Sequence, residues 1–177
     1  MENKLILEFQ DNTTIEIDVR YHIQTINGSS GLGKSYICYL IEFAKESPTI
    51  LKSTNIPLDS ILVWDSISSM NNTVTNKLII IDRYSFFRGV VEWLADFINS
   101  SKTNRFILIT HSSTPEIEIG AQADLLLQYN EETKAFKTVV YFDTPEYWKG
   151  TGFFPNGRKV FGWDRVLTDN RHMYEGI

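Results

Sequence analysis

The sequence is poor in the residues that build disulfide-bonded or metal-bound domains. It has one cysteine, Cys38, so no disulfide can form within the chain. Because Cys38 stands in an apolar helical pattern, we expect a buried free thiol rather than a nucleophile. The three histidines are dispersed and lack the spacing of metal ligands.

Long apolar runs are missing as well. No run approaches the roughly 20 residues that a membrane-spanning helix needs, and the polar start MENK lacks the basic and apolar regions of a secretory signal. The net charge of −5 gives no overall electrostatic case for binding nucleic acid, although it does not exclude a local basic patch. We therefore expect a cytoplasmic protein without a membrane span.

The composition is that of a globular protein. Of the 177 residues, 42% are hydrophobic and 22% are charged. This length is enough for one well-buried core and too short for two ordinary domains. We expect a single domain with appendages.

Strand and helix patterns alternate along the first 142 residues. Alternating or continuous apolar runs predict strands at 4–10, 13–19, 21–27, 49–53, 60–64, 77–82, 105–110, 123–129 and 136–142. Apolar residues spaced by three and four predict helices at 34–46 and 86–99. The first two strands and the last two each flank a turn, which predicts two antiparallel hairpins. The buried strands between them predict an α/β sheet with helices on both faces.

A glycine-rich turn connects the strand 21–27 to the helix 34–46. It reads Gly28-Ser29-Ser30-Gly31-Leu32-Gly33-Lys34-Ser35 and fits the pattern GxxxxGK[ST] at every required position. The glycines permit backbone torsions that let successive amides point at phosphate oxygens, and the helix N-terminus adds positive potential. Lys34 can reach the β- and γ-phosphates, and the Ser35 hydroxyl can bind Mg²⁺. We therefore predict that these eight residues bind the phosphates of a nucleotide.

Asp82 ends the apolar strand 77–82, where a carboxylate can support the phosphate-bound Mg²⁺. With these features the chain resembles the P-loop NTPase superfamily: residues 28–35 resemble its Walker A motif and residues 78–82 its Walker B motif. The resemblance implies a three-layer α/β sandwich. Its central sheet would be mainly parallel, with antiparallel hairpin strands at the N-terminal and C-terminal ends, and its cofactors would be ATP and Mg²⁺.

Within that superfamily, residues 3–142 resemble a minimal ABC-type ATPase core. The opening hairpin, the segment FILITHS and the closing strands ADLLLQY and FKTVVYF carry this resemblance. It implies that His111 is a switch histidine that contacts the γ-phosphate and acts with Lys34 and Asp82 in catalysis. A plainer role for His111, capping the end of a strand or binding water, stays open.

The sequence departs from the ABC-type pattern at the catalytic base. Arg83 stands where those enzymes place a water-activating glutamate, and a guanidinium cannot accept a proton near neutral pH. An LSGGQ-like signature is missing too. Asp65 or Glu92 could replace the base, but both fit a solvated surface. The sequence therefore favours an ATP-binding switch with weak or partner-dependent hydrolysis. A module that binds nucleotide without hydrolysing it is an alternative.

A second alternative is a nucleoside or nucleotide kinase. Residues 82–84 read Asp-Arg-Tyr, as in thymidylate-kinase-like enzymes, where the arginine helps to hold phosphates. On that interpretation Arg83 stabilises transferring charge. Those enzymes begin almost at their glycine turn, lack the additional strand that 105–110 would form, and carry an Arg-rich lid that is not evident here.

Recognition of the base is weakly encoded. Tyr21 and Phe9 precede the glycine turn and could stack on adenine, although both also fit a sheet. No Asn/Thr-Lys-x-Asp guanine motif is present, which favours ATP over GTP.

The last 35 residues have no regular period. We expect residues 1–142 to form the nucleotide-binding domain and residues 143–177 to form an extension that packs on it. The extension interleaves aromatic and basic residues, which suits a protein partner, a second copy of the chain or, with less support, nucleic acid. Arg158 or Arg165 could reach the site of a neighbouring subunit.

Overall fold

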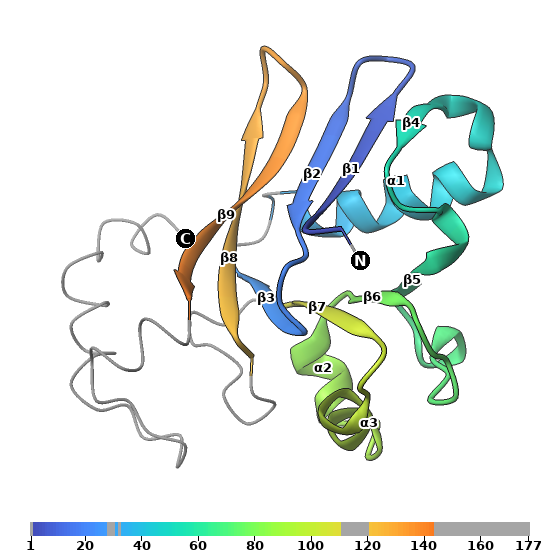
Figure 1. Ribbon diagram of the computed structural model, residues 1–177, viewed down its shortest axis with the longest axis vertical. Coiled ribbons are helices and arrows are strands. Elements are labelled where there is room, and N and C mark those ends of the chain that lie inside the picture. Colours follow the sequence, from blue (N-terminus) through green and yellow to red (C-terminus); the bar gives the residue numbers. More distant parts are fainter. Residues whose placement is uncertain (1, 28–30, 32, 111–120, 144–177) are drawn as a thin grey trace.

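The computed structural model of the protein describes residues 2–27, 31, 33–110 and 121–143. Nine strands form one sheet in these ranges (Figure 1). The strands are β1 (Lys4–Phe9), β2 (Thr14–Asp18), β3 (Ile23–Asn27), β4 (Leu51–Thr54), β5 (Ile61–Trp64), β6 (Leu78–Ile81), β7 (Arg105–Ile109), β8 (Ala123–Asn130) and β9 (Ala135–Asp143). The helices are α1 (Lys34–Glu46), α2 (Tyr84–Arg88) and α3 (Leu94–Ser100), with 3-10 turns at Pro48–Ile50, Leu58–Ser60 and Ile67–Ser69.

The sheet mixes parallel and antiparallel pairs. Its strand order is β4-β1-β2-β9-β8-β3-β7-β6-β5. The strands from β8 to β5 in this order are parallel to one another, whereas β1 pairs antiparallel with β2 and β4, and β8 pairs antiparallel with β9. The two predicted hairpins are therefore confirmed. A parallel pair between β2 and β9 joins them side by side.

The predicted three-layer sandwich is wrong. The structure is a curled mixed sheet with few helices, not a parallel sheet flanked by two helical layers. The reason lies in the connections between strands. Residues 65–77, which join the parallel strands β5 and β6, contain only the turn Ile67–Ser69, and residues 55–60 contain only the turn Leu58–Ser60. Such segments offer no amphipathic helix to cover a sheet face.

The sheet curls around α1, which forms as the periodicity predicts. Ile37 and Ile41 of this helix share one buried cluster with Leu7 of β1, Ile15 of β2 and Ile107 of β7. Strands from distant positions in the sheet thus pack against the same helix (Figure 1). Curvature of the sheet, rather than a full helical layer, encloses this core.

The short helices α2 and α3 pack against the other face of the parallel strands. Phe87, Leu94 and Ile98 are buried there against Phe106 of β7. The single helix predicted at 86–99 is wrong, because α2 ends at Arg88, with Gly89 as its C-cap, and α3 begins only at Leu94. Among the described helices, none is long and apolar enough to cross a membrane.

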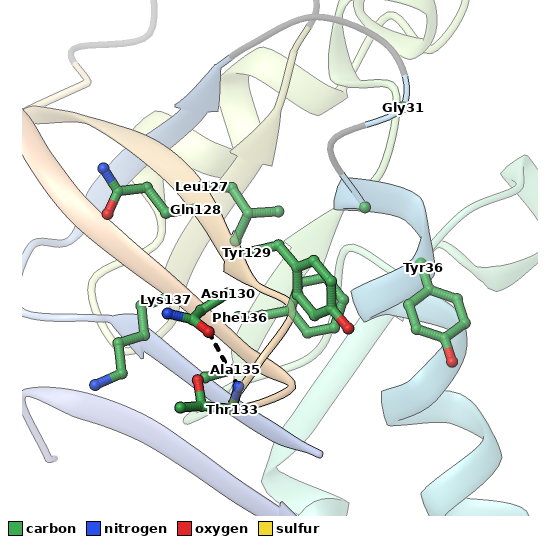
Figure 2. Close-up of a pocket in the computed structure, with 11 residues that line it drawn as sticks. Gly31, Tyr36, Leu127, Gln128, Tyr129, Asn130, Thr133, Ala135, Phe136 and Lys137 are labelled. Carbon is green, nitrogen blue, oxygen red and sulfur yellow. Dashed lines mark hydrogen bonds between the residues drawn. The ribbon is translucent and has the colours of Figure 1, made fainter.

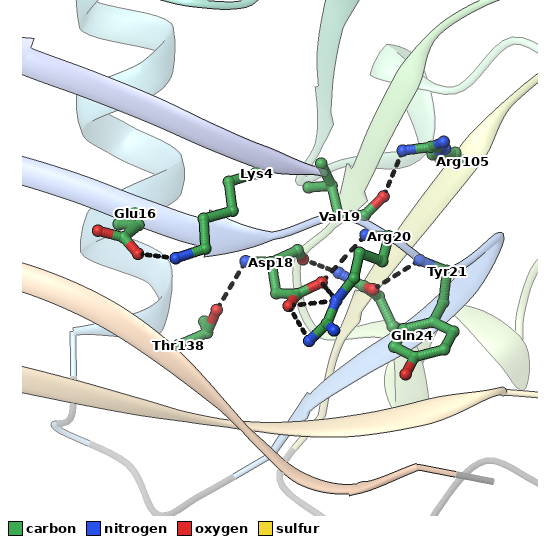
Figure 3. A network of polar contacts seen from close by, with 9 residues as sticks. All are labelled: Lys4, Glu16, Asp18, Val19, Arg20, Tyr21, Gln24, Arg105 and Thr138. Atoms are coloured by element: carbon green, nitrogen blue, oxygen red, sulfur yellow. Dashed lines mark hydrogen bonds and ion pairs between the residues drawn. The ribbon is translucent and has the colours of Figure 1, made fainter. Parts of the chain in front are cut away.

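Polar contacts fasten the segment that enters β3, at the end of this strand away from the glycine turn (Figure 3). Arg20 donates to the Asp18 carboxylate from Nε at 2.8 Å and from Nη2 at 2.6 Å. Arg105 of β7 donates from Nη1 to the Val19 carbonyl at 2.6 Å. The Asp18 N–H donates to Oγ1 of Thr138 on β9 at 2.8 Å. These contacts hold β2, β7 and β9 together around the start of β3.

Candidate nucleotide-phosphate site

The described residues of the predicted site lie at the carboxyl edge of the parallel strands. β3 leads into the glycine turn, and α1 begins at Lys34. β6 leads into Asp82, and β7 lies between β3 and β6. Parallel strands end at the same edge of a sheet, so residues distant in sequence meet there, and ligands of open α/β sheets bind at that edge.

The two described glycines of the turn adopt left-handed backbone conformations. The φ angle is 89° at Gly31 and 87° at Gly33, values that L side chains rarely adopt. Space is restricted at Gly33 as well, since a Cβ there would lie 2.7 Å from Cε1 of Phe136. At Gly31 such a Cβ would meet nothing within 4 Å. Gly31 is therefore required by its torsion alone, and Gly33 by its torsion and by the ring.

Lys34 is the first residue of α1 and is only 4% exposed. Burial lowers the pKa of its ammonium group, and the negative charge of Asp82 opposes this effect. The N-terminus of a helix carries positive potential of its own. A buried cation beside a helix N-terminus favours an anionic ligand, because an anion compensates the charge that has been removed from water.

Ser35 and Asp82 meet directly. The Ser35 hydroxyl donates to Oδ1 of Asp82 at 3.1 Å. The Asp82 N–H donates to the Trp64 carbonyl at 3.0 Å, and the same Oδ1 accepts the N–H of Arg83 at 2.9 Å. Asp82 is 6% exposed. The backbone of Asp82 is thus bonded to Trp64, and its carboxylate oxygen accepts from two donors, the Ser35 hydroxyl and the Arg83 N–H.

Arg83 links the ends of β5 and β6. Its backbone is left-handed, with a φ of 52°. Its Nη2 donates to the backbone carbonyl of Asp65 at 2.9 Å, and its guanidinium lies 5.9 Å from the ring centroid of Phe87. In this structure the guanidinium therefore has partners within the protein.

The two predicted substitutes for the catalytic base lie in different places. Asp65 follows β5, and its charge acts on the Cys38 thiol of α1 together with that of Asp82. Glu92 is exposed in the segment between α2 and α3. Asp65 is therefore the carboxylate that the structure places at the same edge as Asp82.

Part of the predicted site falls outside the described residues. This applies to Gly28, Ser29, Ser30, Leu32 and His111, and to residues 144–177 of the predicted extension. The two aromatic residues predicted for base stacking lie elsewhere. Phe9 is buried in the core, and Tyr21 precedes β3 at the opposite end from the glycine turn, where the Arg20 guanidinium lies 5.6 Å from its ring centroid.

The sequence did not predict a groove that lies beside the glycine turn (Figure 2). Its volume is about 1110 Å³, and it is lined by Gly31, Gly33 and the β8–β9 hairpin. Tyr129 of β8 and Phe136 of β9 stand directly opposite each other, with ring centroids 4.5 Å apart. The Phe136 centroid lies 5.9 Å from that of Tyr36 on α1.

The sequence offers little signal for this groove. The three rings come from a helix and from two strands whose register cannot be read from apolar patterns alone. The exposed position of Tyr36 on α1, one residue after the phosphate motif, was the available hint.

A buried polar network lies under the start of the glycine turn. Both carboxylate oxygens of Asp124 on β8 accept from Nδ2 of Asn27, the last residue of β3, at 3.0 Å. Thr25 donates its hydroxyl to the same carboxylate, and Thr110 donates its hydroxyl to Oδ1 of Asn27. Burial raises the pKa of Asp124 to about 6, although its hydrogen bonds oppose the shift. This network joins β8, β3 and the end of β7.

Among the described residues, no group of three or more His, Cys, Asp or Glu side chains could hold a metal ion. The pair Ser35 and Asp82 fits Mg²⁺, which uses few protein ligands and takes the others from water and phosphate oxygens. The sequence matches no protein-family model and no curated protein, so the inference of function starts from this site.

Proposed function

We propose that this protein binds ATP with Mg²⁺ and acts as a nucleotide-dependent switch whose hydrolysis is weak or depends on a partner. The observation that carries the proposal is the contact of Ser35 with Asp82 beside the buried Lys34. Under this proposal, the relation to P-loop NTPases lies in the glycine turn and the residues that meet it, and not in the helical layers.

The groups of the site suit a polyphosphate and its metal ion. Lys34 and the amides of the glycine turn would bind phosphate oxygens, and Ser35 and Asp82 would hold Mg²⁺. The 3.1 Å between the two side-chain oxygens is close to the roughly 3 Å that separates adjacent ligands of an octahedral Mg²⁺ ion. The ion would supply positive charge to the phosphates.

Slow hydrolysis follows from Arg83, which cannot serve as a base. Loss of a positioned base typically lowers the rate about 10²- to 10⁴-fold. Asp65 at the same edge is the candidate that could restore part of this rate, and a protein partner or a second copy of the chain could supply the remainder. Phosphate release per chain that rises with protein concentration would support the second copy.

The kinase alternative has less support. The strand that thymidylate-kinase-like enzymes lack is present as β7, between β3 and β6. The Arg83 guanidinium, which would hold phosphates in a kinase, bonds the Asp65 carbonyl. ADP formation that requires a nucleoside or nucleoside monophosphate acceptor would reverse this preference.

Calorimetric titration with ATP and Mg²⁺ tests the proposal. Wild type should bind, and Lys34→Ala should lose most of the affinity. Lys45→Ala, which removes the lysine of α1 that pairs with Glu42, should bind like wild type and serves as the control. Absence of ATP binding by the wild-type protein, or equal binding by Lys34→Ala, would refute the proposal. ATP binding without phosphate release above background would favour the alternative of a module that binds nucleotide without hydrolysing it.

A further inference from the structure

The groove of Figure 2 continues directly from the phosphate site. Gly31 and Gly33 belong to the glycine turn and also line this groove. β8 carries the opposite wall beyond the end of β3, because Asn27, the last residue of β3, pairs with Leu126 while β8 extends to Asn130. A ligand whose phosphates lie at the turn would therefore have its remaining part beside this wall.

Aromatic rings dominate the side of the groove that faces the turn. In Figure 2, Tyr129 and Phe136 lie on this side of the hairpin, whereas Gln128 and Lys137 point away from it. Phe136 is buried under its neighbours, but Tyr129 is 49% exposed and Tyr36 is 51% exposed. Two ring surfaces thus stand open to solvent beside a buried one.

The Phe136 ring holds this arrangement in place. It packs on the Tyr129 ring with an interplanar angle of 30°, contacts the Tyr36 ring, and leaves no room for a Cβ at Gly33. Aromatic rings held in position lose little conformational freedom when a flat ligand stacks on them. The rings of the groove are therefore preorganised to bind a planar group attached to a polyphosphate.

We propose that this groove binds the base of the nucleotide by stacking on Tyr129 and Tyr36. The inference rests on the proposed function, since the phosphates place the base. Every nucleobase has a ring face, so stacking discriminates weakly between bases. The site should therefore accept GTP as well as ATP, with affinities within about tenfold of each other, and the base should contribute a large part of the affinity.

Two ligands and three variants separate this inference from the proposed function. Inorganic tripolyphosphate with Mg²⁺ carries the phosphates without a base, and it should bind wild type more weakly than ATP does. Tyr129→Ala should weaken ATP binding roughly 5- to 150-fold, as stacking substitutions do, and leave tripolyphosphate binding unchanged. Tyr129→Phe keeps the ring and should bind ATP like wild type. Tyr21→Ala removes a ring at the opposite end of β3 from the glycine turn and should also bind like wild type.

Several results would overturn the inference while the phosphate site stands. These are equal binding of tripolyphosphate and ATP by wild type, an equal loss of both ligands in Tyr129→Ala, and a loss in Tyr21→Ala as large as that in Tyr129→Ala. A preference for ATP over GTP of more than about 100-fold would contradict recognition by stacking, because hydrogen bonding to the base edge would then be needed. If wild type bound neither ATP nor tripolyphosphate, the proposed function itself would fail.

Discussion

The ring of Phe136 packs against the backbone of Gly33, at the point where the glycine turn enters α1. A Cβ on Gly33 would approach Cε1 of this ring to 2.7 Å, a distance that real Cβ atoms essentially never show. Phe136 in turn pairs with Ile15 of β2 and stands opposite Tyr129 of β8. The hairpin strands therefore help to determine the shape of the turn that would hold phosphates.

Gly33→Ala should damage both stability and nucleotide binding. Alanine at a φ of 87° is strained, and its Cβ would displace the Phe136 ring. We expect a loss of about 1–3 kcal/mol in the free energy of unfolding, measured with urea, and ATP affinity lowered more than about tenfold. Gly89→Ala is the matched control, because its φ is −80° and its added Cβ would lie 3.7 Å from the nearest atom. If both variants behaved alike, the special requirement at Gly33 would be disproved.

Asp82→Asn should uncouple ATP binding from Mg²⁺. In wild type, we expect ATP affinity to fall when EDTA removes the ion, because Ser35 and Asp82 hold it against the phosphates. The amide of asparagine is a much poorer Mg²⁺ ligand than a carboxylate. The variant should therefore bind ATP with the same affinity with and without Mg²⁺, as measured by titration. Asp65→Asn, at the same edge, should keep the Mg²⁺ dependence and lose any slow phosphate release. A Mg²⁺ response preserved in Asp82→Asn would contradict this assignment.

Local patterns predict the elements of this fold well. The helix 34–46 follows from its apolar spacing, and both hairpins follow from alternating residues around short turns. Long-range features do not follow in the same way. The pairing of β2 with β9 depends on contacts such as Ile15 with Phe136, which no local period encodes. The helix break after Arg88 does not follow from the torsion of Gly89, whose φ is −80°, and the apolar pattern that continues through Leu94 and Ile98 predicts one unbroken helix.

The candidate site divides in the same manner. Lys34, Ser35 and Asp82 were predicted because a contiguous motif and a strand end place them, and the structure brings Ser35 and Asp82 into contact. The groove could not be predicted, because Tyr36 and Phe136 meet only after the sheet has curled. A contiguous motif predicts the local conformation of its own residues, whereas a groove between distant segments depends on the whole fold.

The Asp124 carboxyl should contribute more to the stability of the protein in mild acid than at neutral pH. Burial raises its pKa from 3.8 to about 6, so the folded chain binds the proton more tightly than the unfolded chain does. The resulting stabilisation is complete below pH 4 and is lost as the pH rises through 6. Two pKa units correspond to about 3 kcal/mol. Urea unfolding from pH 4 to 7 should show this loss in wild type, and Asp124→Asn should lack it.

Asp11→Asn provides a control of opposite sign. Hydrogen bonds from the Thr13 N–H and hydroxyl lower the pKa of Asp11, so its contribution is present above pH 4 and disappears only as the pH falls through the lowered value. This variant should keep the wild-type change in stability between pH 4 and 6. If Asp11→Asn abolished that change, or Asp124→Asn left it intact, the assignment to the buried carboxyl would be wrong.

Cys38 should be inert in the folded protein, which makes it a reporter of opening at the site. It lies one helical turn after Lys34 and is buried. Burial raises the pKa of its thiol, and the nearby charges of Asp82, Asp65 and Glu42 raise it further.

Only the thiolate of a cysteine reacts with disulfide reagents, and each unit of raised pKa lowers the thiolate fraction about tenfold. Labelling at pH 8 should therefore be more than about tenfold slower in the native protein than in urea. Because the chain has no other cysteine, the measured rate belongs to this thiol. Equal labelling rates in both states would show that α1 does not bury Cys38 beneath the site.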